Sequence, residues 1–158
     1  MKALFAAGCF WGVQFYFDKL QGVETSVVGY TGGDRPNPSY EQVCSHATGH
    51  FEAIEVSYDP KKVSYEALVK YFFEIHDFEQ KDGQGPDRGP QYRSAIFYGN
   101  EEEKSIAEHI VQVLTDKGYS VATLLLPAKP FYAAELYHQN YYATNGHAPY
   151  CHRFRKIF

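Results

Sequence analysis

The sequence predicts a protein of the α/β (α+β) class, a two-layer sandwich with a mixed sheet and a ferredoxin-like βαβ core. Segments with strand and helix patterns alternate along most of the chain, as expected for helices packed on one sheet. No helix pattern separates the strand segments 23–30 and 51–58, which disfavours a doubly wound parallel sheet. With 158 residues, the chain fits a single domain over 1–158 that ends in a mobile tail, 146–158.

The first elements predict a strand, a tight turn and a helix. Residues 2–7 are short and apolar, as in a buried strand. Apolar residues then recur at helical spacing from Cys9 to Leu20, and Gly22 stands where a helix would end. Residues 23–30 read as a second strand. Cys9 is therefore expected at a strand-to-helix turn.

The middle of the chain predicts two more strands around a helix. Residues 51–58 alternate in polarity, as a strand does, and Ser64 is a candidate N-cap for a helix that reaches Ile75. Residues 77–92 are rich in glycine and proline and predict a long loop, which in a compact domain is usually functional. Residues 94–98 form the next strand.

The last part predicts a helix from Asn100 to about Lys117, a strand over 119–126 and a short helix over 132–142. A basic segment, 147–158, completes the tail.

Composition excludes several classes of protein. The net charge of −4 gives no general basic surface for nucleic acid or an anionic membrane. No stretch approaches the roughly 18 apolar residues of a membrane helix. Three cysteines, an odd number, suit a reducing compartment such as the cytoplasm and a reactive thiol. No heptad pattern suggests more than a monomer.

The strongest local signal for chemistry is Gly8-Cys9-Phe10-Trp11-Gly12. A thiolate is the nucleophilic form of cysteine, and the free N–H groups of a helix N-terminus favour it. The two glycines would let backbone approach the site closely. Alternatively, Cys9 is a small buried apolar residue and Trp11 belongs to the core.

Glu52 is a candidate general acid. In the predicted strand it shares a face with Ile54, Val56 and Tyr58, and burial there would raise its pKa so that it holds a proton at neutral pH. A solvated glutamate on an edge strand is the alternative. Loop residues that can reach the same site are Tyr40, Asp87 and Tyr92.

The other two cysteines differ in setting. Cys151 lies in the tail beside basic residues, which suits the second thiol of a redox cycle, although an incidental cysteine fits equally well. Cys44 follows Val43 and reads as buried and inert. Clusters around His50 and His152 lack the spacing of a zinc site, so no metal is predicted, and no cofactor-binding loop is present.

The segment from Gly8 to Gly12 resembles the signature of the peptide methionine sulfoxide reductase A family. Further segments resemble that family in the same order along nearly the whole chain: GYTGG at 29–33, NPSYE at 37–41, TGH at 48–50 followed by Glu52, YDP at 58–60, FEIHD at 73–77, GPQYRS at 89–94 and YHQ at 137–139.

The resemblance implies thiol-dependent reduction of the S epimer of methionine sulfoxide, free or in a peptide, by an α/β sandwich. Cys9 would attack sulfur, and Glu52 would protonate the oxygen with help from Tyr40 and Tyr92. The implied methyl pocket is formed by Phe10 and Trp11, and Asp87 would help to hold the site.

The resemblance also implies that Cys151 resolves the Cys9 sulfenic acid as a disulfide, which thioredoxin reduces. Family members differ in their resolving cysteines, so direct reduction of the sulfenic acid stays open. One departure is Phe51, where alanine is common; it faces away from Glu52, so we expect little effect.

Two other classes remain as alternatives. A cysteine–histidine hydrolase or acyl transferase would use Cys9 with His50 or His138 as base, but it gives no reason for an acidic Glu52. A binding module would use the aromatic pocket alone.

Overall fold

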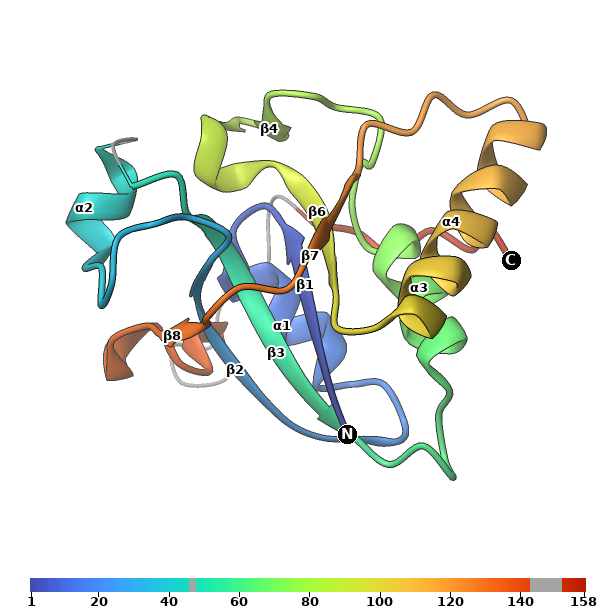
Figure 1. The fold of residues 1–158 in the computed structure, drawn as a ribbon, viewed down its shortest axis with the longest axis horizontal. Helices are drawn as coiled ribbons and strands as arrows, with labels where there is room; N and C mark the ends of the chain where they lie inside the picture. The colour runs from blue at the N-terminus through green and yellow to red at the C-terminus, as the bar shows by residue number, and fades with distance from the viewer. Residues whose placement is uncertain (46–47, 143–151) are drawn as a thin grey trace.

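A computed structural model describes residues 1–45, 48–142 and 152–158. Its main feature is a six-stranded sheet in the order β7-β6-β1-β3-β2-β8 (Figure 1). These strands are β1 (Lys2–Ala7), β2 (Val23–Thr31), β3 (Phe51–Tyr58), β6 (Ser94–Tyr98), β7 (Leu124–Pro127) and β8 (Tyr132–Ala133). A separate two-stranded ribbon pairs β4 (Gly83–Gln84) with β5 (Asp87–Arg88).

The sheet confirms the predicted class and topology. Its four central strands run β6-β1-β3-β2, and every neighbouring pair among them is antiparallel. Since β3 lies between β1 and β2, the first βαβ unit is split, as in a ferredoxin-like fold. The parallel pairing of β6 with β7 makes the sheet mixed.

Helices α1, α3 and α4 cover one face of the sheet, and the chain between β7 and β8 crosses the other (Figure 1). The helices are α1 (Phe10–Phe17), α2 (Tyr40–Cys44), α3 (Tyr65–Glu74) and α4 (Glu101–Asp116), and two 3-10 turns are η1 (Pro90–Tyr92) and η2 (Leu136–His138). The predicted N-caps at Ser64 and Asn100 are confirmed, because their side chains accept from Ala67 and Glu103 amides.

The helix-covered face holds the main, largely aromatic core. Phe5 of β1 stacks against Phe17 of α1 and Phe72 of α3, with ring centroids 5.4 and 5.2 Å away. The opposite face holds a smaller cluster in which Phe51 meets Phe97 edge to face. Phe51 therefore packs on the face away from Glu52's neighbours, as predicted.

Two predicted elements differ from the structure, and helix α2 is an addition to the prediction. The strand expected at 119–126 begins only at Leu124. The helix expected at 132–142 is wrong: Tyr132 pairs with Tyr30 of β2, so sheet pairing overrides the local pattern. Helix α2 was not predicted, since its five residues are too short for a helical period; Ser39 and Gln42 close it with a capping box.

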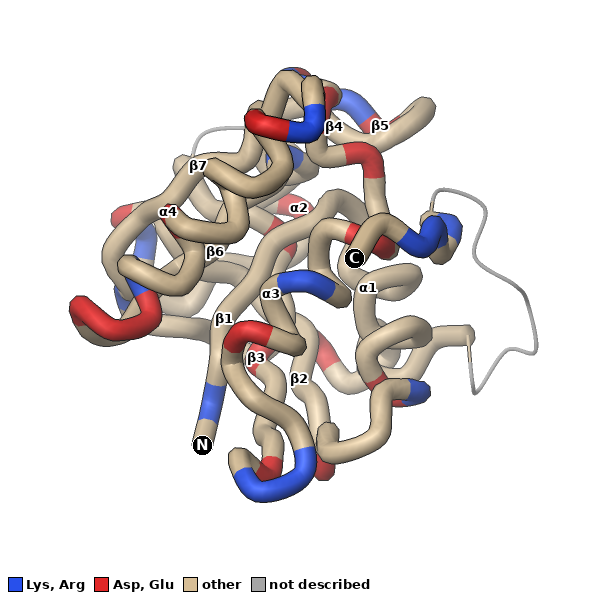
Figure 2. Tube along the Cα trace, turned by 90° about the vertical axis from the view of Figure 1, so that its right-hand side faces the viewer, with Lys and Arg blue, Asp and Glu red and all other residues tan. Residues whose placement is uncertain are grey.

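Residues 152–158, the described part of the predicted tail, contact the core. Their backbone meets the end of α3, and the chain end lies beside that helix (Figure 2). Figure 2 also shows acidic and basic residues interspersed along the described trace. Within that part of the chain, no helix has both the length and the apolar character needed to cross a membrane.

Candidate active site

Cys9 lies at the turn between β1 and α1, as the sequence predicts. Gly8 makes this turn with a φ of +87°, a conformation that a side chain would strain. Cys9 occupies the N-cap position of α1 and is 7% exposed. The thiol therefore lies at the N-terminus of a helix, a position where the positive end of the helix dipole generally favours the anionic, nucleophilic form of cysteine.

Glu52 is the buried carboxyl beside this turn. It projects from β3 and is 1% exposed, and its Oε1 accepts the amide hydrogen of Phe10 at 3.3 Å. Its Oε2 has no hydrogen-bond partner within normal bonding geometry among the described residues, although the Tyr92 phenol lies close enough to lower the pKa of the carboxyl. Burial, and next the negative charge of Cys9, raise the pKa of Glu52 well above its ordinary value, against the lowering effect of the Phe10 amide. Burial therefore favours the neutral, proton-bearing form of this carboxyl.

The two phenols named from the sequence lie next to Glu52. Tyr40 begins α2 and Tyr92 ends η1. Burial raises the pKa of both phenols, and the nearby Glu52 carboxyl raises it further. Both therefore keep their protons throughout the physiological range and act only as hydrogen-bond donors or neutral acceptors.

Asp87 and Cys44 approach the same site. Asp87 belongs to β5, and its charge adds to the raised pKa of Glu52. Cys44 is half-buried rather than buried, and its thiol shares a hydrogen bond with the Tyr40 phenol. No sequence pattern indicated this contact, because it is α2 that turns the residue toward the site.

The apolar wall of the site depends on a histidine. Trp11 donates its indole Nε1–H to Nδ1 of His138 at 3.0 Å. The His138 ring is 2% exposed and packs within 5.3 Å of Phe10 and 4.6 Å of Tyr40, measured between centroids. His138 therefore contacts three of the four aromatic residues that the sequence assigned to the site. Sequence reasoning considered it only as a base, because its partners lie far away in the chain.

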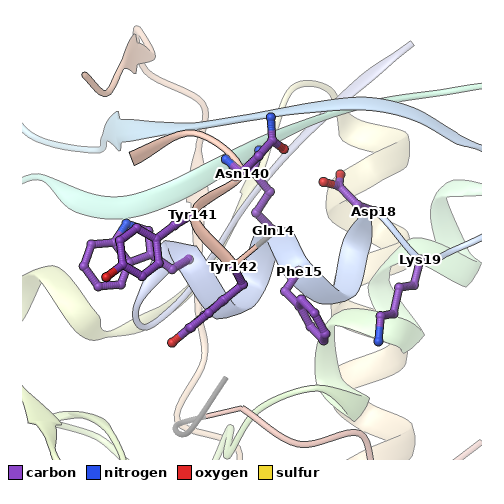
Figure 3. Close-up of a pocket in the computed structure, with 8 residues that line it drawn as sticks. Gln14, Phe15, Asp18, Lys19, Asn140, Tyr141 and Tyr142 are labelled. Atoms are coloured by element: carbon purple, nitrogen blue, oxygen red, sulfur yellow. Dashed lines mark hydrogen bonds between the residues drawn. The ribbon is translucent and has the colours of Figure 1, made fainter. Parts of the chain in front are cut away.

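A groove continues outward from Trp11 along α1. It encloses about 210 Å³ and is lined by Trp11, Gln14, Phe15, Asp18, Lys19, Asn140, Tyr141 and Tyr142 (Figure 3). Tyr141 stacks on the Trp11 indole with ring centroids 3.8 Å apart and an angle of 8° between the rings. This stacking fixes one face of the indole.

The remaining candidates have other settings. Cys151 lies outside the described residues. Both ring nitrogens of His50 are held by backbone, Nδ1 by the Gly33 amide at 3.1 Å and Nε2 by the Arg35 carbonyl at 2.6 Å, so His50 is poorly suited to act as a base. Among the described residues, no group of histidine, cysteine and acidic side chains is arranged to hold a metal ion.

Comparison with known proteins finds matches along nearly the whole chain. A family model described as peptide methionine sulfoxide reductase matches residues 1–157. The peptide methionine sulfoxide reductase MsrA of Nautilia profundicola is 51% identical over 150 residues, covering 95% of this chain and 87% of that protein.

Solved structures are similar as well. Mxr1 from Saccharomyces cerevisiae in its reduced form matches with a TM-score of 0.90 and 35% identity, over 99% of this chain and 92% of that one. Mxr1 in complex with Trx2 matches with a TM-score of 0.67 and 26% identity, over 99% and 90% of the two chains.

Proposed function

Since the chain belongs to the peptide methionine sulfoxide reductase family and reduces methionine sulfoxide to methionine, we propose how its own residues carry out that reaction. The main observation behind this proposal is the setting of Glu52, a buried carboxyl with a raised pKa beside Cys9. One of its oxygens accepts a backbone hydrogen bond, and the other has no such partner among the described residues.

Glu52 is the proton donor. Its Oε1 accepts from the Phe10 amide, so the proton belongs on Oε2, the oxygen that has no partner in the described part of the chain. A sulfoxide oxygen leaves sulfur only when it is protonated, and a buried acid supplies that proton at neutral pH. The phenols of Tyr40 and Tyr92 remain protonated and donate hydrogen bonds to the same oxygen.

Phe10 and Trp11 receive the methyl group of the substrate. Sulfur and methyl contacts with aromatic rings are favourable by about 0.3–1.5 kcal/mol. The aromatic wall lies on one side and the acid and phenols on the other, so the pocket selects one arrangement of methyl and oxygen at sulfur. This difference supports selection of one epimer at sulfur, which we propose to be S, the epimer that the family resemblance implies. Asp87 helps to hold the polar side through its backbone or a water, and its negative charge favours the protonated form of Glu52.

The reaction balances in three steps. Cys9 thiol and methionine sulfoxide give methionine and the Cys9 sulfenic acid. The Cys151 thiol then condenses with the sulfenic acid, which forms a disulfide and releases water. Thioredoxin reduces that disulfide and is itself oxidised; the complex of the yeast relative with Trx2 supports this choice of reductant. We further propose that the protein is a monomer and acts in the cytoplasm, where thiols stay reduced.

The test compares wild type with Cys151→Ser, using thioredoxin or dithiothreitol as reductant. A variant that keeps dithiothreitol-supported turnover and loses thioredoxin-supported turnover supports the disulfide route. Full turnover with thioredoxin would instead mean that the sulfenic acid is reduced directly. Cys9→Ser should abolish turnover with either reductant. In a module that only binds its ligand, the wild type would show no turnover and the same substitution would leave ligand binding unchanged.

A further inference from the structure

Residues 152–158 are fastened to the core by a buried carboxyl. Glu74, the last residue of α3, is 6% exposed, and its Oε2 accepts the amide hydrogens of Ile157 at 2.9 Å and Phe158 at 3.3 Å. Its backbone carbonyl accepts from the Arg155 amide at 2.7 Å. One residue of α3 thus takes three backbone hydrogen bonds from this segment. The Phe158 ring also packs on the core beneath Lys70.

His152, at the other end of the segment 152–158, packs against the residues on either side of the Cys9 turn. His152 is 5% exposed, and its ring nitrogen Nε2 bonds to the Ala7 carbonyl at 2.6 Å. Its ring fills the space where a Cβ on Gly12 would lie, which explains why that position in the first turn of α1 carries glycine. Tyr16 of α1 donates its phenol to the His152 carbonyl at 3.4 Å.

We propose that residues 152–158 act as a clasp, with Glu74 and His152 as positioning residues for disulfide formation. Cys151 directly precedes His152 in the chain, so the clasp fixes the backbone that follows the second thiol and fixes it against the Cys9 turn. The inference rests on the proposed role of Cys151 and concerns a later step than methionine formation.

The size of the effect follows from chain statistics. Once the clasp is released, the nearest described residue on the other side of Cys151 is Tyr142, which is buried and nine positions earlier in the chain. In general, an unrestrained chain of about nine residues has a root-mean-square reach of roughly 17 Å, against about 7 Å for a thiol within two peptide units of a fixed point. The effective concentration falls with the cube of the reach, so releasing the clasp should slow disulfide formation about tenfold.

The experiment is a single turnover of full-length Glu74→Ala with methionine S-sulfoxide and no added reductant. Methionine formation and disulfide formation are followed separately in quenched samples. We expect methionine to form at the wild-type rate and the disulfide to form about tenfold more slowly, with the sulfenic acid accumulating. Glu74→Gln keeps an acceptor oxygen for the amides and should restore the disulfide rate.

Glu103→Ala is the matched control. Glu103 is also a buried glutamate, 8% exposed, that accepts a backbone amide, from Gly99 at 2.8 Å, but it lies on α4 outside the clasp. Its loss should lower stability and leave both rates unchanged. Phe158→Ala, which removes a half-buried ring, serves if Glu74→Ala folds poorly, and should slow the disulfide step alone.

A wild-type disulfide rate in Glu74→Ala and Phe158→Ala would overturn the clasp and leave the role of Cys151 intact. Equal slowing in Glu103→Ala would overturn it too, since general loosening would then be the cause. If Cys151 is not the second thiol, the result is different: Cys151→Ser would then keep thioredoxin-supported turnover. The two proposals can therefore fail separately.

Discussion

Replacing Glu52 by glutamine separates the proton donor from the geometry of the site. The glutamine side chain would keep an acceptor oxygen for the Phe10 amide, which Oε1 of Glu52 holds at 3.3 Å. Its NH₂ group would take the place of Oε2, where it can donate a hydrogen bond but cannot transfer a proton. The variant therefore removes general acid catalysis and little else.

The expected loss is about 10²–10³ in the rate of methionine formation, the lower part of the usual range for a general acid, because one hydrogen bond survives. This corresponds to about 3–4 kcal/mol of activation free energy. The assay is methionine release in a single turnover at saturating sulfoxide, with the Michaelis constant measured in parallel and expected to change little.

The pH profile gives a second, independent readout. The wild-type rate should fall as pH rises through the raised pKa of Glu52, because the acid must be protonated. That falling limb should be missing in Glu52→Gln. A variant that reacts within about threefold of wild type, or that keeps the same falling limb, would refute the assignment of Glu52 as the acid.

Glu52→Gln should lower the reaction rate but raise the stability of the fold. Burial holds a proton on Glu52 in the folded state at pH values where the unfolded chain has lost it. The folded state thus binds more protons, so Glu52 makes the free energy of unfolding fall as pH rises above the ordinary range of a glutamate. Glu52→Gln removes this cost, and its advantage in thermal midpoint should grow with pH.

Three further variants test the surroundings. His138→Phe removes the acceptor of the Trp11 indole N–H and should raise the Michaelis constant about fivefold with kcat little changed, as expected for a lost hydrogen bond worth about 1 kcal/mol; a loss confined to kcat would contradict this role. Phe51→Ala should lower the free energy of unfolding by about 3 kcal/mol and leave both kinetic constants unchanged, because the ring packs on the opposite face of the sheet. Burial lowers the pKa of His76 to about 3, so stability should fall as pH drops from about 6.5, where the unfolded chain takes up this proton. In His76→Gln, the free energy of unfolding should fall less steeply as pH drops below about 6.5. A variant with the same pH dependence as wild type would refute His76 as the cause.

Local patterns predicted the parts of the site that local sequence controls. The apolar run before Gly8 and the helical spacing after it placed Cys9 at a turn, and the alternation of β3 placed Glu52 on a buried face. Both follow from periodicity, which a single segment carries by itself.

Contacts between distant segments could not be read in that way. Trp11 and His138 are 127 positions apart, and only the folded sheet brings η2 over α1. The same holds for Cys44, which meets Tyr40 through a helix too short to show a period, and for Tyr132, which joins β2 against its helical pattern. Tertiary packing decides such positions, so propensity alone misplaces them.

The most direct test of the account counts products and thiols in one turnover. Reduced wild-type protein, with its three cysteines, is mixed with excess methionine S-sulfoxide and no reductant. We expect about one methionine per chain and the loss of two thiols, Cys9 and Cys151, while Cys44 stays titratable. The R epimer and the Cys9→Ser variant should give no methionine. Methionine formation in Cys9→Ser, or a disulfide mapped to Cys44, would contradict the account.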